Sequence, residues 1–151
     1  MKNTGVRFTG MAAMAVVAIM SLANPAWAQE IRLRARQNKQ INGIEAQLRG
    51  DYRERANPVR LNSELENINL PVGTPVAFCL VQNGVKSRLG VGRVAVVGGV
   101  RVATVELAAN DGDAVPKVNA GEVLQARQKA VAPFRTNPGC GAALLIAAPF
   151  K

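Results

Sequence analysis

Residues 75–107 read PVAFCLVQNGVKSRLGVGRVAVVGGVRVATVEL, and this stretch decides the fold. Nearly all of its residues are small, β-branched or apolar. β-branched side chains are stiff at χ1 and pack well on a pleated surface, so they favour strands. Four glycines argue against a helix, because each would cost it roughly 1 kcal/mol. They are Gly90, Gly92, Gly98 and Gly99.

The stretch divides into three predicted strands. Residues 75–82 are apolar at both odd and even positions, which is typical of a strand buried on both faces. Asn83-Gly84 follows directly, and both residue types tolerate positive φ, so a type I′ hairpin turn is expected there. The return strand starts at Val85 and runs on through Val96. Gly98-Gly99 is a second tight turn, and residues 100–107 form the third strand.

The region before this stretch alternates apolar and polar residues with the period of a half-buried strand. Strands are predicted over residues 29–39, 44–52 and 59–66, with Asn42-Gly43 as the turn between the first two. Residues 41–52 also fit a helix, since apolar side chains recur there at helical spacing. Gly43 and Gly50 favour the strand.

The region after it contains a connection over residues 108–121, a short strand over 122–127 and an apolar closing strand over 142–150. About eight short strands separated by turn signals indicate an all-β protein. We therefore predict a single immunoglobulin-like antiparallel β-sandwich of seven to eight strands, comprising residues 29–151.

Residues 1–28 have the features of a signal peptide. Lys2 and Arg7 are followed by the apolar run 11–22, and Ala26-Trp27-Ala28 is a cleavage site of the A-x-A type. The run is too short to span a bilayer comfortably. We expect a periplasmic or secreted bacterial protein without a transmembrane span in its mature chain. The alternative is an uncleaved membrane anchor.

The chain has two cysteines, Cys79 and Cys140. In an oxidising compartment such a pair predicts a disulfide, here between the central strand and the turn at residues 137–141. The alternative is two buried free thiols. A redox role is not expected, because no C-x-x-C motif is present to lower the pKa of a thiol.

The composition narrows the function classes. The chain contains no histidine, which excludes Ser-His-Asp and Cys-His catalysis and histidine-based zinc sites. The sequence therefore predicts no enzyme, no cofactor and no metal. The formal net charge is +9, and it falls to +7 when Lys2 and Arg7 leave with the signal peptide. Nucleic acid is not an expected partner, since export removes the protein from it and Tyr52 alone could stack on bases.

Basic residues are concentrated in the first third of the mature chain. If the strands are placed correctly, several of their side chains share one sheet face. Arginine suits bidentate contacts to anions, so the face would attract an anionic envelope polymer or an acidic protein. The alternative is a solvated face that keeps the protein soluble. The candidate anion-binding residues are Arg32, Arg34, Arg36, Lys39, Arg49, Arg53, Arg55 and Arg60.

Two further motifs carry less weight. Residues 90–95 match G-x-G-x-x-A, but a valine-rich strand and a Gly-Gly turn follow where a dinucleotide site needs a helix. Glycines that let strands bend and pack closely are the expected explanation. Residues 110–113 read NDGD, which offers too few oxygens for calcium and is typical of a turn.

Several blocks together resemble a family of small exported bacterial β-sandwich domains. They are N-L-P-x-G-T at residues 69–74, N-D-G-x-x-V-P at 110–116, and Ala120-Gly121-Glu122-Val123, which is similar to an A-G-x-x-V block. The family also ends near a small residue before Phe, like Ala148-Pro149-Phe150 here. The resemblance covers residues 43–150 and implies the fold. The family has no assigned activity, and Cys79 and Cys140 are not part of its pattern.

Three functions follow from the sequence. The first is a non-catalytic envelope module that binds or supports structure, holding an anionic polymer through the arginine-rich face. The second is an inhibitor or chaperone-like module that pairs with a protein through an edge strand. The third is a hydrolase that uses carboxylates without a recognisable pattern.

Overall fold

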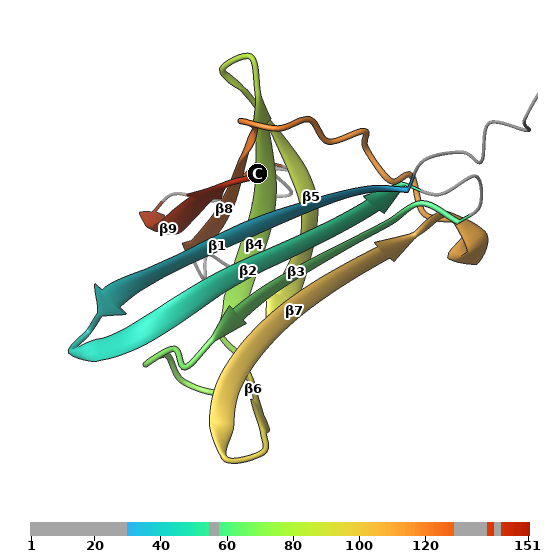
Figure 1. Cartoon of the computed structure of the whole chain (residues 1–151). Helices are drawn as coiled ribbons and strands as arrows, with labels where there is room; N and C mark the ends of the chain where they lie inside the picture. Colours follow the sequence, from blue (N-terminus) through green and yellow to red (C-terminus); the bar gives the residue numbers. More distant parts are fainter. Residues whose placement is uncertain (1–29, 55–57, 129–138, 141–142) are drawn as a thin grey trace, which may run out of the picture.

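The computed structural model describes residues 30–54, 58–128, 139–140 and 143–151, and the described chain forms two antiparallel β-sheets (Figure 1). The five-stranded sheet has the order β1 (Ile31–Ile41), β2 (Ile44–Glu54), β3 (Arg60–Glu66), β7 (Val100–Ala108), β6 (Ala95–Val97). The four-stranded sheet has the order β5 (Val85–Arg93), β4 (Pro75–Gln82), β8 (Val123–Gln128), β9 (Ala143–Pro149). One turn of 3₁₀ helix, η1 (Ala109–Asp111), follows β7. The prediction of an all-β protein is confirmed.

No helix among these residues has the length and apolar character needed to cross a membrane. The predicted signal peptide, residues 1–28, lies outside the described residues, as does Arg55.

The turns explain why the hairpins form where they do. Asn42 and Gly43 have φ of 50° and 80°, and Asn83 and Gly84 have φ of 50° and 79°. Two successive positive φ angles give the turn whose twist matches that of paired strands. β1 pairs with β2 from Ile31 opposite Glu54 to Ile41 opposite Ile44, so the strand prediction for residues 44–52 is confirmed and the helix alternative is excluded.

The return strand after Asn83-Gly84 is shorter than predicted. It breaks at Val94, which separates β5 in one sheet from β6 in the other. The backbone of Val94 bonds to the preceding loop, because its N–H donates to the Thr74 carbonyl at 3.0 Å and its carbonyl accepts from the Gly73 N–H at 2.8 Å. The break makes nine strands instead of seven to eight among the described residues.

The strand order differs from that of the immunoglobulin fold. There the first, second, fifth and fourth strands share one sheet. Here β1, β2 and β3 form a continuous meander in one sheet, and β4 begins the other. The immunoglobulin-like arrangement is therefore not confirmed.

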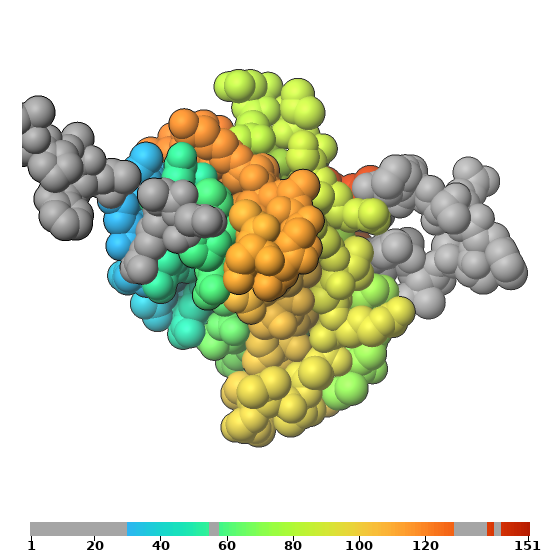
Figure 2. Space-filling model, turned by 90° about the vertical axis from the view of Figure 1, so that its right-hand side faces the viewer, coloured from blue at the N-terminus to red at the C-terminus, as the bar shows by residue number. Residues whose placement is uncertain are grey.

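The hydrophobic core lies between the two sheets. Leu48, Tyr52 and Leu61 from the first sheet are buried against residues of the second, among them Phe78 and Leu124. Gly50 gives these side chains room, because a Cβ atom there would lie 2.8 Å from Leu124 Cδ2 and 3.0 Å from Phe150 Cζ. In Figure 2 the loop that follows β7, drawn in orange, lies between the strands of the first sheet and β5.

The end of the described chain joins the first strand. Ala35 and Phe150 form a β-bridge, and Phe150 is buried. The Arg34 N–H donates to the Lys151 carbonyl at 3.0 Å, and the Lys151 N–H donates to the Arg34 carbonyl at 2.9 Å. Residues that follow β9 thus pair along the outer edge of β1.

Glycines bring β5 close to β7. A Cβ atom on Gly90 would lie 2.7 Å from Val105 Cγ1, and one on Gly92 would lie 2.5 Å from the Thr104 carbonyl oxygen. The glycines of the G-x-G-x-x-A match therefore allow a close approach of two strands, as the sequence predicts.

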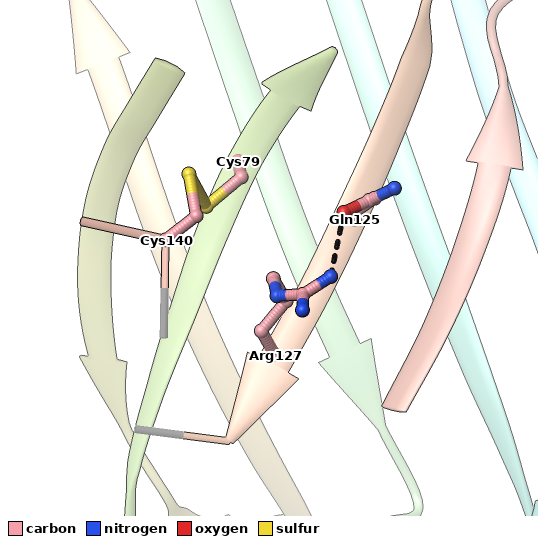
Figure 3. Close-up of a disulfide and its surroundings, with 4 residues drawn as sticks. All are labelled: Cys79, Gln125, Arg127 and Cys140. Atoms are coloured by element: carbon pink, nitrogen blue, oxygen red, sulfur yellow. Dashed lines mark hydrogen bonds between the residues drawn. A yellow bond between two sulfur atoms is a disulfide. The ribbon is translucent and has the colours of Figure 1, made fainter. Parts of the chain in front are cut away.

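The predicted disulfide between Cys79 and Cys140 is present, with the Cα atoms 5.8 Å apart (Figure 3). Cys79 alternates along β4 with the core residues Phe78 and Leu80, so its side chain lies on the opposite face of the strand. Cys79 is nevertheless fully buried. The two apolar faces of residues 75–82 are explained, since the core covers one face and the disulfide occupies the other.

Candidate functional site

Six of the eight predicted anion-binding residues lie on the outer face of the five-stranded sheet. The register places Arg53 of β2 between Arg32 of β1 and Arg60 of β3. Two positions further along β1 lies Arg34, and two positions beyond it Arg36 lies opposite Arg49. Their side chains alternate with the inward-facing core residues of the same strands. We call this surface the arginine face. Its arginines are Arg32, Arg34, Arg36, Arg49, Arg53 and Arg60.

Lys39 does not join the arginine face. It has the parity of the buried residues Ala35 and Ile41, and its Nζ donates to the Leu145 carbonyl oxygen of β9 at 2.9 Å. Its charge thus lies on the side of β1 that meets the other sheet.

The arginine face is nearly balanced in charge. Carboxylates lie on the same face as the arginines. The pairing of β2 with β3 and of β3 with β7 brings acidic residues of β3 and β7 to this face. The carboxylates on this face of the described strands are Glu45, Asp51, Glu64, Glu66 and Glu106. The alternation thus places the arginines on one face as the structure has them, whereas these carboxylates were not assigned to it from the sequence.

The charges are not evenly distributed, because several guanidinium groups share Asp51. Arg32 Nη2 lies 2.6 Å and Arg53 Nε 2.8 Å from the Asp51 carboxylate, and Arg34 Nε lies 3.8 Å from it. Partial burial raises the pKa of Asp51, but hydrogen bonds from Arg53 and Arg32, together with their charges, outweigh it and hold this pKa below its usual value. The charge of Glu30 also acts on Arg53, so the three arginines around Asp51 meet two carboxylates and this end keeps an excess of positive charge.

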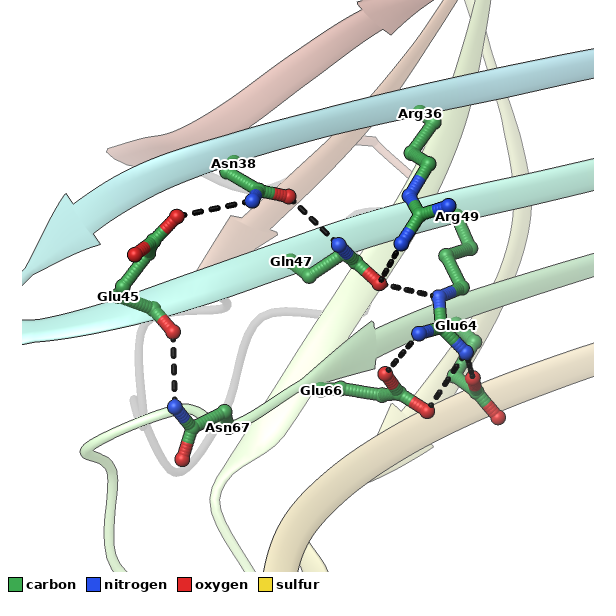
Figure 4. Close-up of polar contacts among 8 residues, drawn as sticks. All are labelled: Arg36, Asn38, Glu45, Gln47, Arg49, Glu64, Glu66 and Asn67. Atoms are coloured by element: carbon green, nitrogen blue, oxygen red, sulfur yellow. Dashed lines mark hydrogen bonds and ion pairs between the residues drawn. The ribbon is translucent and has the colours of Figure 1, made fainter.

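A hydrogen-bonded network covers the other half of the arginine face (Figure 4). Gln47 Nε2 donates to Asn38 Oδ1 at 2.6 Å, and Gln47 Oε1 accepts from Arg36 at 3.3 Å and also from Arg49. Arg49 Nη2 lies 3.0 Å from Glu66, and its Nη1 lies 3.8 Å from Glu64. Arg36 is thus paired with a neutral amide, whereas Arg49 is paired with carboxylates.

The two glutamates of β3 influence each other. Burial raises the pKa of Glu64, and a hydrogen bond to Glu66 and the charge of Glu66 raise it further, while Arg49 lowers it. Two carboxylates therefore share one guanidinium group in this half of the face, whereas several guanidinium groups share one carboxylate around Asp51.

Two shallow hollows run across the arginine face. Rows of outward side chains lie two residues apart, about 7 Å along the strands, and the row between them points into the core. One hollow of about 390 Å³ lies between the row of Arg34 and Asp51 and the row of Arg36 and Arg49, over Gly50. A second, of about 240 Å³, lies on the other side of the Asp51 row and is walled by Arg53, Arg60 and Glu106 among others. The hollows offer guanidinium groups to a ligand lying on the sheet.

Two carboxylates in the connection after β7 have structural partners. Asp113 accepts a hydrogen bond from the Ala108 N–H at 3.0 Å, which fastens the predicted turn after β7. Glu122 accepts from Gln82 at 2.9 Å and from the side chain of Asn119 at 2.8 Å. Slight burial raises the pKa of Glu122, and these bonds with the Asn119 N–H lower it more, so the net shift is downward. In the part of the chain that the structure describes, no three His, Cys, Asp or Glu side chains are grouped so as to hold a metal ion.

The chain matches no protein-family model, no curated protein and no solved structure.

Sequence reasoning missed the amide pair of Asn38 and Gln47 and the carboxylate pair of Glu64 and Glu66. Both were within reach of the sequence, because the Asn42-Gly43 turn fixes the register of β1 and β2, in which Asn38 faces Gln47. Glu64 and Glu66 lie two residues apart on the polar side of an alternating strand. Aligning that strand with β2 requires the length of the connection between them, which residue types alone do not give.

The Asp51 cluster predicts a pH dependence of stability. A carboxyl whose pKa is lowered by folding stabilises the native state above its unfolded pKa of about 3.9, and this contribution is lost as the pH falls through the lower folded value. We expect the difference in unfolding free energy between the unchanged protein and Asp51→Asn to shrink as the pH is lowered from 5 to 2. The effect should stay below about 1 kcal/mol, because the cluster is partly exposed to solvent. Urea unfolding at a series of pH values measures it, and a difference independent of pH would contradict the assignment.

Proposed function

We propose that this protein is an exported, non-catalytic β-sandwich module of the bacterial envelope that holds an anionic polymer on its arginine face. The carrying observation is that Arg32, Arg34 and Arg53 lie around one carboxylate, that of Asp51. A phosphate or carboxylate of a ligand would supply the missing negative charge and accept bidentate hydrogen bonds.

The spacing of the arginines supports a polymer as the ligand. Arg32, Arg34 and Arg36 follow one another at every second position of β1, which sets them about 7 Å apart along the strand. The side chain of Arg34 is 64% exposed. A chain of regularly spaced anions lying along β1 would meet these groups in succession, whereas a single small anion would meet one or two.

The rest of the chain supports an exported binding module. Residues 1–28 have signal-peptide features, and the Cys79–Cys140 disulfide fits an oxidising compartment. The chain contains no histidine, so the commonest general base and metal ligand is missing from its chemistry. We therefore infer a role in binding rather than catalysis.

Removing the charges of β1 tests this function. The variant Arg32→Ser, Arg34→Ser, Arg36→Ser is expected to lose binding to polygalacturonate and to polyphosphate, which carry carboxylates and phosphates respectively. Loss of three ion contacts should weaken binding by about a hundredfold or more at low salt. Co-sedimentation at low salt and at about 0.5 M salt, where electrostatic reach shortens to a few ångströms, measures it.

The matched control removes the same charge elsewhere. Lys86→Ser, Arg88→Ser, Lys117→Ser takes three exposed cations from outside the arginine face, so it changes net charge equally. The control is expected to retain most of the binding. Equal losses in both variants would reduce the effect to net charge, and unchanged binding in the β1 variant would refute the proposed function.

A protein partner that pairs along an edge strand is the second candidate. β5 is an edge strand of the four-stranded sheet, and Val85 at its start is well exposed. Main-chain pairing depends little on ionic strength. A one-to-one complex that survives about 0.5 M salt would favour this candidate over the polymer.

A further inference from the structure

The β6–β7 hairpin lies at one end of the molecule (Figures 1 and 2), and several of its valines are exposed. Its turn, Gly98-Gly99, has φ of 57° and 84°. Exposed fractions are 58% for Val96, 60% for Val97 and 43% for Val100. Val72, 61% exposed, lies in the loop that is bonded to Val94 at the base of the hairpin through Gly73. We call these four residues the valine tip: Val72, Val96, Val97 and Val100.

Apolar side chains lie on both faces of the hairpin. Val97 lies opposite Val100 in the β6–β7 register, and Val96 lies opposite Arg101. Successive residues of a strand point to opposite sides, so Val97 and Val100 occupy one face, and Val96 shares the other with Arg101. A protein partner covers one face of a hairpin, whereas a lipid medium surrounds it. This arrangement favours a membrane over a flat protein surface.

Two cations lie beside the valine tip: Arg93 ends β5, and Arg101 lies opposite Val96 in the hairpin. The acid Glu66, which lies opposite Val102 at the base of the hairpin, is ion-paired with Arg49 at 3.0 Å. Arg93 and Arg101 flank the hairpin, and both are exposed. Arg93 donates to the Gly73 carbonyl and Arg101 to Asn69, so both groups lie at the level of the Val72 loop. This charge distribution is complementary to anionic lipid headgroups.

The length of the hairpin fits the interfacial region of a bilayer. Ala95 pairs with Val102, which itself pairs with Glu66 at the end of β3, so β6 extends two residues beyond the neighbouring strand. At about 3.4 Å per residue, the hairpin projects about 7 Å past β3, which lies within the depth that interfacial elements occupy. We propose that the valine tip inserts into the surface of an anionic lipid membrane, with Arg93 and Arg101 on the headgroups.

Vesicle binding tests the insertion. The variant Val96→Ser, Val97→Ser is expected to partition into phosphatidylglycerol vesicles about tenfold more weakly than the unchanged protein, because two valine side chains are no longer transferred from water to the membrane. The control Val85→Ser, Leu144→Ser removes two similarly exposed apolar side chains from other strands and is expected to bind as the unchanged protein does. All variants carry the same N-terminus, checked by mass. Equal binding of the tip variant and the unchanged protein would overturn the proposal.

The role of Arg93 and Arg101, which we call the positive rim, is tested with a second pair of variants. Arg93→Ser, Arg101→Ser is expected to weaken binding to phosphatidylglycerol vesicles more than Arg34→Ser, Arg36→Ser, although both remove two charges. Phosphatidylcholine vesicles should bind all variants weakly. An equal effect of the two pairs would refute the role of the rim.

A fluorescent reporter places the tip directly. The only tryptophan of the chain is Trp27, so a Trp27→Phe background with Val97→Trp reports on the tip and one with Val85→Trp on β5. Blue-shifted emission with vesicles is expected for Val97→Trp alone, and its absence in vesicle-bound protein would overturn insertion. The outcomes are separable from the proposed function, since the tip variant should still bind polygalacturonate.

Discussion

Removing the disulfide with Cys79→Ala, Cys140→Ser is expected to lower the free energy of unfolding by about 4 kcal/mol. The two cysteines are 61 residues apart in sequence, and opening a loop of that size returns this much chain entropy to the unfolded state. In a domain of this size the change corresponds to a fall in Tm of about 15 °C. The loss affects a central strand, because Cys79 lies in β4 between β5 and β8.

Urea unfolding of the two proteins measures the difference. The unchanged protein in reducing buffer is a second route to the same state, and it should approach the double variant. A loss below about 1 kcal/mol would mean that the unfolded chain is equally restricted without the bond, which would contradict the entropic account.

The second large effect is expected at the crossing of β5 and β7. Gly92→Ala should destabilise the protein by about 3 kcal/mol, because the new methyl group would lie 2.5 Å from the Thr104 carbonyl oxygen and 2.9 Å from its nitrogen. These are backbone atoms of a paired strand, so no side-chain rotation relieves the contact. Thermal and urea unfolding measure the loss.

Gly90→Ala provides the matched comparison, because its new methyl group would meet a side chain. The contact is with Val105 Cγ1 at 2.7 Å and Cγ2 at 3.1 Å. Adding Val105→Ala removes both atoms, so the double variant should be more stable than Gly90→Ala alone. The same Val105→Ala change should not rescue Gly92→Ala. Rescue of both glycine variants, or of neither, would contradict the close packing described here.

Much of the fold was predictable because the residues that determine it act locally. Asn42-Gly43, Asn83-Gly84 and Gly98-Gly99 each favour positive φ, and each forms the turn that the sequence predicts. Alternation along β1 and β2 then assigns Leu48 to the core and Arg49 to the solvent. These signals need no knowledge of distant residues.

The break at Val94 was not predictable in this way. Val91, Val94 and Val96 are equally suited to one continuous strand. The strand breaks because the Val94 backbone forms hydrogen bonds with residues 73 and 74. This tertiary contact, and not the strand propensity of the local residues, determines where the strand ends. The assignment of strands to sheets depends on the same long-range contacts, so the immunoglobulin-like order did not follow from the number and spacing of strands.

The site was predictable to a similar extent. Period-two alternation places Arg32, Arg34 and Arg36 together because they belong to one strand. Lys39 follows at an odd distance and therefore faces the other way, which the same rule could have shown. Glu106 reaches the face through β7, far along the chain, and its position depends on the pairing of Asn62 with Glu106. The electrostatic balance of the face was for this reason beyond local sequence reasoning.

Arg34 pairs with Lys151, and Gly50 packs against Phe150. These contacts join the beginning of the described chain to its end, so we expect them to form late in folding. The β1–β2–β3 meander is local and quick to form, yet its apolar side stays uncovered until the last strands arrive. Closing such distant contacts is slow, so we expect folding in milliseconds to seconds rather than microseconds. A nascent chain would expose this apolar side for all of that time, so we expect its folding intermediates to be prone to aggregation until the last strands pack.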